Sequence, residues 1–385
     1  MTDLPFVQIV PVALRGLDTS TSNGIDIEKH LNAAIDWIQC AHRAAGDGGI
    51  SKGYDLLRSR WVQSYPETTG YTIPSLLNLA ILLKRPELRQ LAFSLADYLL
   101  QNVTPEGGVV HWQAGSKADP IVFDTGQVMF GWLAAYEASN DGRYLDAAVR
   151  AGDWLASIQD ASGSWIQFQH LGVKKVIDTR VAWALLRLYR HSSDDRHLEA
   201  AVRNLDWAVQ QQDPDGWFRH CAFLEDEDPF THTLAYTAEG LFECGQLLQE
   251  DRYLAASRLT ADALLARQRS DGSLASLYAS GWRETSRSSC LTGNCQMARL
   301  WLSFYQVTNK QDYTIAAEQA ITFVTRTQNV RTSNPNIRGG IAGSYPIYGC
   351  YERFKYPNWA AKFFVDALLA LAGTKKQEDL LVYVG

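Results

Sequence analysis

The chain has 385 residues, of which 46 % are apolar and 20 % charged, and its formal net charge is −6 at pH 7. This composition is ordinary for a globular protein, and a negative chain without a Lys/Arg cluster excludes the usual basic surface for nucleic acid. The sequence has no apolar run of 18 residues and no secretory leader pattern, so we expect neither a membrane span nor export. Six well-separated cysteines predict reduced thiols and a cytoplasmic location.

A sequence repeat organises the chain. Residues 1–25 lack clear periodicity and predict an N-terminal arm, and residues 26–385 predict a single domain. Within it, DGRYLDAAVRAGDWLASIQDASGSW (141–165) is matched by DDRHLEAAVRNLDWAVQQQDPDGWF (194–218), with Asp141 aligned to Asp195 and Trp154 to Trp207. An offset of 52 to 54 residues is typical of a helical-pair repeat.

The repeat predicts two alternating sets of six helices. The first set is amphipathic, and each helix ends near Gln or Asn before a Gly-containing turn. The second set is apolar almost all round, which is typical of buried helices. This alternation predicts an all-α fold, an (α/α)6 toroid, rather than a linear solenoid, which normally needs polar capping repeats. The first set lies within residues 27–45, 86–112, 141–165, 194–218, 251–274 and 311–329, and the second covers 72–83, 125–139, 179–191, 233–248, 292–307 and 358–372.

The starts of the second helices carry recurring polar residues, as in Thr69-Gly70, Asp124-Thr125-Gly126 and Thr292-Gly293-Asn294. Capping of free N–H groups explains the threonines. In a closed toroid the six starts converge on one mouth, where helix dipoles favour anions. We therefore expect any active site at that mouth.

Carboxylates at these starts predict acid/base chemistry. Glu67 in YPETTGY and Asp124 in VFDTGQ are candidates for the two carboxyl groups that cleave a glycosidic bond, and Asp178 begins the next second helix. Asp124 and Asp178 are equally well explained as N-caps, whereas Glu67 has no obvious capping role.

A second group combines cations, amides and proton carriers. His232 and Tyr236 share one helix face, as do Asn358 and Lys362. Such groups can neutralise a sugar carboxylate while Tyr or His moves a proton on the adjacent carbon; alternatively, they form buried ion pairs between hairpins. The group comprises Arg180, His232, Tyr236, Asn294, Gln296, Asn358 and Lys362.

Aromatic residues near the helix ends are candidate sugar platforms: Tyr71, Trp112, Trp165 and Trp217. Each Trp can equally pack against the corner of its own hairpin. A metal is not expected, because Cys290 and Cys295 are five residues apart, with Cys350 in a later loop and no His nearby. No cofactor is expected either.

Several segments resemble known toroidal enzymes. QDASGSW (159–165) and QQDPDGW (211–217) resemble the Gln/Gly/Trp repeats of terpenoid cyclases and protein prenyltransferase β subunits. The catalytic motifs of these families are not matched. The EDED run at 225–228 is not the cyclase aspartate motif, and the Asp/Cys/His zinc ligands of prenyltransferases have no clear match. FDTGQVMFGWLAAYEASNDGRYLDAA with TRVAWALLRLY resembles unsaturated uronyl hydrolases, sugar 2-epimerases and uronate lyases. YPETTGY, THTLAY, CLTGNCQ and YPNWAAKFF are similar to bacterial toroid proteins associated with polysaccharide synthesis.

These observations favour a carbohydrate-active enzyme that binds an acidic, uronate-containing oligo- or polysaccharide. For a glycoside hydrolase, Glu67 and Asp124 form the acid/base pair, and Arg180 and Lys362 bind a substrate carboxylate. For a uronate lyase or C5-epimerase, Tyr236 and His232 move the proton while Asn294, Gln296 and Arg180 stabilise the anion. A terpenoid cyclase or prenyltransferase and a non-catalytic glycan-binding toroid are the other hypotheses. The sugar, the linkage and the oligomeric state stay open.

Overall fold

The computed structural model describes residues 25–111, 119–376 and 385, so nearly all of the expected arm lies outside the described residues. The chain divides into two compact units. Unit 1 takes in the described residues of Met1–Gln63, Phe230–His232 and Leu264–Leu380, and unit 2 those of Ser64–Pro229, Thr233–Ala263 and Leu381–Gly385. No helix among the described residues is long and apolar enough to cross a membrane.

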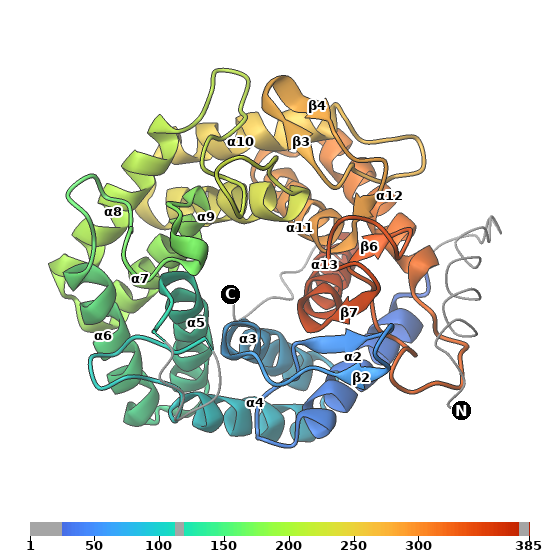
Figure 1. Cartoon of the computed structure of the whole chain (residues 1–385), viewed down its shortest axis with the longest axis horizontal. Coiled ribbons are helices and arrows are strands. Elements are labelled where there is room, and N and C mark those ends of the chain that lie inside the picture. Colours follow the sequence, from blue (N-terminus) through green and yellow to red (C-terminus); the bar gives the residue numbers. More distant parts are fainter. Residues whose placement is uncertain (1–24, 112–118, 377–384) are drawn as a thin grey trace. The chain divides into compact units, whose positions relative to one another are not determined.

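The described residues form twelve α-helices that alternate between a half-exposed set and a buried set, as the sequence predicts (Figure 1). The half-exposed set bears a polar stripe, and the buried set is apolar nearly all round. The half-exposed helices are α2 (Ile27–Ala45), α4 (Pro86–Leu99), α6 (Gly142–Ser157), α8 (Asp195–Gln210), α10 (Asp251–Leu265) and α12 (Gln311–Thr327). The buried helices are α3 (Pro66–Leu82), α5 (Val122–Ser139), α7 (Thr179–Ser192), α9 (Thr231–Leu248), α11 (Leu291–Thr308) and α13 (Asn358–Lys376).

Each tight hairpin consists of a buried helix followed by the next half-exposed helix. In unit 2, α3 packs on α4, α5 on α6 and α7 on α8; in unit 1, α11 packs on α12. Among the described residues no buried helix precedes α2, which packs on α13, the last described helix. The connections inside the hairpins are short because residues such as Asn140 and Ser193 take the left-handed conformation that ends a helix.

A glutamine that follows α6, α8 and α10 ties neighbouring repeats together. Gln159 Nε2 donates to Gly163 O at 2.9 Å, which closes its own turn, and to Ala200 O of α8 at 2.8 Å. Gln212 and Gln268 repeat both bonds one repeat further on. The repeated Gln is therefore an inter-repeat tie, beyond the helix end that the sequence predicts.

The Asp residues of the founding repeat are helix caps. Asp141 accepts from Arg143 N at 3.1 Å, and Asp194 accepts from Arg196 N at 3.0 Å. The structurally equivalent pair is thus Asp141 and Asp194, and the predicted alignment of Asp141 with Asp195 is wrong by one residue.

Two buried helices start earlier than the sequence predicts. Helix α3 begins at Pro66 and α5 at Val122, so Glu67 and Asp124 lie inside the first turn. The threonines do not cap these helices: Thr69 Oγ1 donates to Tyr65 O at 2.8 Å, and Thr125 Oγ1 to Ile121 O at 2.7 Å. The capping explanation of the repeated threonines is therefore wrong at these two positions.

The glycines beside those threonines allow buried helices to approach closely. A Cβ on Gly70 of α3 would lie 2.6 Å from Val128 Cα of α5. A Cβ on Gly126 of α5 would lie 3.0 Å from Val181 Cα of α7. The Thr-Gly repeat at the starts of α3 and α5 therefore marks backbone contact between neighbouring helices.

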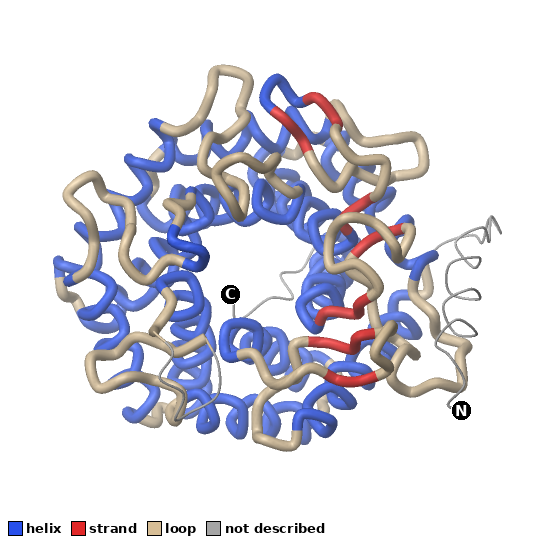
Figure 2. Tube along the Cα trace, viewed as in Figure 1, coloured by secondary structure: helices blue, strands red, loops and turns tan. Residues whose placement is uncertain are grey.

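Seven short strands, all in unit 1, accompany the helices of the described residues (Figure 2). They form one three-stranded antiparallel sheet, β2-β1-β7, and the two-stranded sheets β3-β4 and β5-β6. Strand β7 leads directly into α13 and so fixes its start. The strands are β1 (Gly53–Asp55), β2 (Arg60–Trp61), β3 (Tyr278–Ala279), β4 (Arg283–Glu284), β5 (Ser289–Cys290), β6 (Ser344–Tyr345) and β7 (Lys355–Pro357).

Candidate active site

A hydrogen-bonded group lies at the start of α5 in unit 2. His111 Nδ1 is 2.8 Å from Asp124 Oδ2, and Tyr65 Oη donates to Asp124 Oδ1 at 3.5 Å. The Tyr65 ring packs edge-on against the His111 ring, with centroids 4.9 Å apart. Asp124 is 1 % exposed, and these two side chains contact both oxygens of its carboxyl group. It is not an N-cap, because Ile121 holds that position.

Glu67 belongs to the same neighbourhood from the first turn of α3. Burial raises the pKa of Tyr65 well above its ordinary value, and the charges of Asp124 and Glu67 add to the shift. Glu67 also accepts a hydrogen bond from Tyr65. The Tyr65 hydroxyl therefore lies within the influence of both carboxylates that the sequence proposes as an acid/base pair.

Tyr236, on α9, is poorly suited to act as a base. Burial raises its pKa well above the ordinary value, the charge of Glu67 adds to the effect, and Arg180 and a hydrogen bond with Tyr71 oppose it. Its ring packs on Phe123, with centroids 5.3 Å apart. The phenol stays protonated near neutral pH, which disfavours the proton-abstraction role expected from the sequence.

Asp178 has the environment of a protonated carboxylic acid. It is fully buried, and burial raises its pKa to about 7, while the charge of Lys175 and a hydrogen bond from Gln169 act in the opposite direction. Gln169 Nε2 donates to Asp178 Oδ2 at 2.5 Å, whereas Oδ1 has no hydrogen-bond partner. Asp178 precedes α7 in the N-cap position, but its side chain makes no capping bond.

Lys175 stabilises the segment that carries Gln169 and His170. Its Nζ donates to His170 O and, at 3.2 Å, to Val173 O. Burial lowers the pKa of Lys175, and the charge of Asp178 counteracts this. The same segment places the His170 ring on the His111 ring, with centroids 5.2 Å apart and planes 29° apart.

Arg180 connects three neighbouring buried helices. Its Nη1 forms an ion pair with Glu239 of α9, and its Nε donates to Gln127 Oε1 of α5 at 2.8 Å. The rings of Phe130, Trp183 and Tyr236 surround the guanidinium group, with its carbon 4.8–5.3 Å from their centroids. The alternative interpretation from the sequence, a buried ion pair between hairpins, describes Arg180 well.

His232 lies in unit 1 at the start of α9. Its Nδ1 is 2.7 Å from Gln296 Oε1 of α11. The Tyr351 ring lies 5.3 Å from the imidazole, and Tyr351 Oη accepts from Trp359 Nε1 at 2.9 Å. Gln296 Nε2 is buried without a hydrogen-bond partner. This second polar group is built from unit 1 alone.

The other polar residues of the second sequence group have structural contacts. Lys362 Nζ forms an ion pair at 2.8 Å with Asp366, one turn further along α13, and the two side chains are 1 % and 8 % exposed. Asn294 Nδ2 donates to Ser289 Oγ and Cys290 O, and its Oδ1 accepts from Leu274 N. Asn358 Nδ2 donates to Ser51 O at 2.8 Å. These contacts give Lys362 and Asn294 partners within the protein, and their roles in substrate binding stay predictions.

The aromatic candidates have different environments. Trp165 is fully buried, and its Nε1 donates to Leu155 O at 2.9 Å, so it packs the corner of its own hairpin and its interpretation as a sugar platform is wrong. Tyr71 is also fully buried. Trp217 is partly exposed and stays a candidate platform, whereas Trp112 lies outside the described residues.

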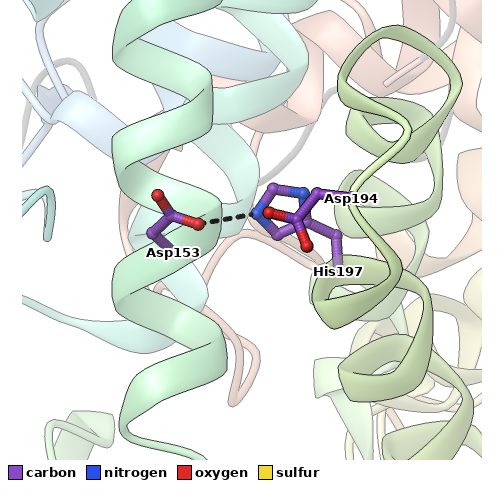
Figure 3. Close-up of side chains that lie close together, drawn as sticks. All are labelled: Asp153, Asp194 and His197. Atoms are coloured by element: carbon purple, nitrogen blue, oxygen red, sulfur yellow. Dashed lines mark hydrogen bonds and ion pairs between the residues drawn. The ribbon is translucent and has the colours of Figure 1, made fainter.

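Three potential metal ligands come together elsewhere in unit 2. Asp153 of α6 faces Asp194 and His197 at the start of α8 (Figure 3). Both carboxylates form ion pairs within the protein. Arg196 Nη2 lies 2.9 Å from Asp153 Oδ1 and 2.6 Å from Asp194 Oδ2, and His197 Nε2 is 3.1 Å from Asp153 Oδ1. This arrangement is that of a helix-cap ion pair. Among the described residues, the cysteines form no such group.

Several residues at this site were not predicted from the sequence: Tyr65, His111, Gln127, Gln169 and His170. The histidines lie in long connections without periodicity, at the end of VVHW and in QFQHLG. Only the tertiary structure brings these two loops to the start of α5. The position of Tyr65 could have been predicted. It directly precedes Pro66, and proline at the first helical position indicates the start of a helix.

The fold is that of toroidal sugar enzymes. No protein-family model and no curated protein matches the chain. Several solved structures are similar. One is an unsaturated glucuronyl hydrolase specific for heparin, with a TM-score of 0.71 and 13 % identity over 92 % of this chain and 98 % of that chain. Another is the unsaturated glucuronyl hydrolase of Streptococcus agalactiae, with a TM-score of 0.69 and 12 % identity over 93 % of this chain and 94 % of that chain. Cellobiose 2-epimerase from Bacillus thermoamylovorans B4167 is also similar, with a TM-score of 0.68 and 12 % identity over 89 % of this chain and 99 % of that chain. This likeness confirms the predicted all-α (α/α)6 toroid and the resemblance to toroidal sugar enzymes.

Proposed function

We propose that the chain is a glycoside hydrolase that acts on an acidic, uronate-containing oligosaccharide. The observation that carries the proposal is the contrast between two buried carboxyl groups in unit 2. Asp178 has a pKa of about 7 and Asp124 is surrounded by hydrogen-bond donors. Such a contrast is what acid/base cleavage of a glycosidic bond requires. Helix α5, which carries Asp124, packs against both α7 and the short 3₁₀ segment Val176–Asp178.

In this mechanism Asp178 is the general acid and donates its proton to the leaving glycosidic oxygen. Asp124 is the general base and accepts a proton from the attacking water, with His111 and Tyr65 holding its carboxylate. Glu67, which the sequence nominates for the acid/base pair, is assigned to hold the Tyr65 hydroxyl. We infer this assignment from hydrogen bonding and burial.

The substrate class is supported by the structural neighbours. One of them is a mutant of the Streptococcus agalactiae unsaturated glucuronyl hydrolase complexed with dGlcA-GalNAc6S, and another is described with dGlcA-Glc-Rha-Glc. Both printed names begin with the sugar unit dGlcA. We propose the same class of ligand here. The lyase or epimerase alternative has less support, because Tyr236 is held protonated.

The test is a panel of uronate-containing glycans, both saturated and carrying a terminal unsaturated uronate. New reducing ends indicate hydrolysis, a new ultraviolet absorbance indicates elimination, and deuterium uptake at C5 indicates epimerisation. The Asp178→Asn variant should lose about 10²- to 10⁴-fold in kcat, the usual contribution of a positioned acid. Full turnover by this variant would remove Asp178 from the mechanism, and no product from any glycan would remove the proposed function.

A further inference from the structure

The two carboxyl oxygens of Asp178, the proposed general acid, have different surroundings. Oδ2 accepts a hydrogen bond from Gln169 Nε2 at 2.5 Å, whereas Oδ1 is buried without a hydrogen-bond partner. Asp178 is 0 % exposed and Gln169 is 6 % exposed. Buried polar atoms in folded proteins nearly always have a partner, so the open position on Oδ1 needs an explanation.

The bond from Gln169 decides which oxygen of Asp178 carries the proton. A protonated carboxyl group has one hydroxyl oxygen, which donates, and one carbonyl oxygen, which accepts. The N–H of an amide can only donate, so it pairs with the carbonyl oxygen, and a proton on Oδ2 would point at this N–H. The proton of neutral Asp178 therefore lies on Oδ1, the oxygen to which no protein group is bonded.

Backbone hydrogen bonds on both sides of Gln169 hold its amide in place. Gly172 N donates to Gln169 O at 3.0 Å. Val122 N, in the first residue of α5, donates to Phe168 O at 2.9 Å. Further along the same connection, the buried ammonium group of Lys175 binds two carbonyl groups. The connection between α6 and α7 is thus fixed to the helix that carries Asp124.

We propose that Gln169 is a positioning residue that places the acid proton of Asp178 on Oδ1 and so directs it to the glycosidic oxygen. The Oδ1–H bond breaks as the proton bonds to the leaving oxygen, which keeps the electron pair of its broken bond to the sugar carbon. The carboxylate that is left is stabilised by the hydrogen bond from Gln169 and by the charge of Lys175. The inference rests on the proposed function, because it adds a residue to that mechanism.

The experiment compares two glutamine variants, each with and without Asp178→Asn. Gln169→Met keeps a side chain of similar length but removes the amide, including the Oε1 atom that has no partner, so the variant should fold. Gln211→Met is the matched control, because the Gln211 amide donates to a backbone carbonyl, that of Trp207, at 3.1 Å. The free energy of unfolding in urea is measured for every protein from about pH 4 to about pH 10.

Subtracting the stability of each Asp178→Asn partner isolates the titration of Asp178. Other charged groups lie on the elements packed around it: Lys175 on its own connection, Asp124 on α5, and Arg180 of α7 with its partner Glu239. These groups are the same in both members of each pair, so the subtraction removes most of their own contribution to the pH dependence.

Loss of a hydrogen bond to the charged form should raise the pKa of Asp178, which is about 7 in the parent protein. The stability that protonated Asp178 contributes is present at low pH and is lost as pH rises through the pKa of the folded state. In Gln169→Met this loss should end about one to two pH units higher than in the parent, whereas Gln211→Met should not move it. On a cleaved uronate glycan, the alkaline limb of kcat should move in the same direction. Below that limb, kcat should fall at least about twofold, since the proton is then shared between two oxygens.

Two results would overturn the inference and leave the proposed hydrolysis standing. One is a loss of stability that ends at the same or a lower pH in Gln169→Met; a lower pH would mean that the Gln169 amide accepts the proton instead of donating. The other is an unchanged kcat below the alkaline limb. A shifted loss of stability without cleavage of any uronate glycan would overturn the proposed function and support the placement of the proton on Oδ1.

Discussion

The buried carboxyl group of Asp178 should make the stability of the protein depend on pH in a defined direction. Its pKa is about 7 in the folded protein, against about 3.9 in an unfolded chain. The folded state therefore binds this proton more tightly. The resulting contribution to stability is fully present below about pH 4 and is lost as pH rises through about 7. Three pKa units at 1.4 kcal/mol each correspond to about 4 kcal/mol.

The Asp178→Asn variant removes this titration while keeping the shape of the side chain. An asparagine oxygen can still accept the hydrogen bond from Gln169 Nε2, and Gln169 Oε1, which has no partner, can accept from the new amide. The free energy of unfolding of the variant, measured relative to that of the parent, should therefore increase by about 4 kcal/mol between about pH 4 and pH 8. A gain in stability together with a loss of activity is typical of an active-site group.

The assay is urea unfolding followed by tryptophan fluorescence, for parent and variant, across this pH range. Asp195→Asn, at an exposed position on α8 where solvent screens the charge, is the control and should change little with pH. Parallel stability curves for the parent and the Asp178→Asn variant would refute the argument, because they would mean that Asp178 titrates alike in the folded and unfolded states.

Three further outcomes are expected. Gly126→Ala should lower the free energy of unfolding by about 1–3 kcal/mol, because its Cβ would press on the α7 backbone; Gly142→Ala, where nothing lies within 4 Å, is the control in chemical denaturation. Arg180→Met should cost about 3–5 kcal/mol, because it removes the guanidinium group that pairs with the buried carboxylate of Glu239. Adding Glu239→Leu should recover much of the loss, and a double variant no more stable than Arg180→Met would contradict this view. Tyr236→Phe should keep kcat within a few-fold, since a protonated phenol is no base, and a large loss of kcat would favour the lyase or epimerase alternative.

The repeat determined most of the fold in advance. The repeat period, the distribution of apolar residues and the Gly-containing turns predict twelve helices that alternate between an amphipathic and an apolar set. The comparison with solved structures confirms the toroid. Helix starts were less well predicted. Thr69 and Thr125 match the composition of a cap, but their hydroxyl groups donate to carbonyls within the helix. Both patterns use the same residue type, so spacing along the chain does not separate them.

The sequence by itself identified the starts of the buried helices as the places where polar residues gather, and it nominated Asp124, Asp178 and Arg180. Only the tertiary structure decided their chemistry. Whether a buried cation is available to a ligand depends on which carboxylate lies beside it, and Glu239, the partner of Arg180, is 59 residues away in the sequence. His111 and His170 likewise lie in separate connections that carry no periodic signal. Burial and long-range contacts set charge and protonation, and neither can be read from the local pattern of residues.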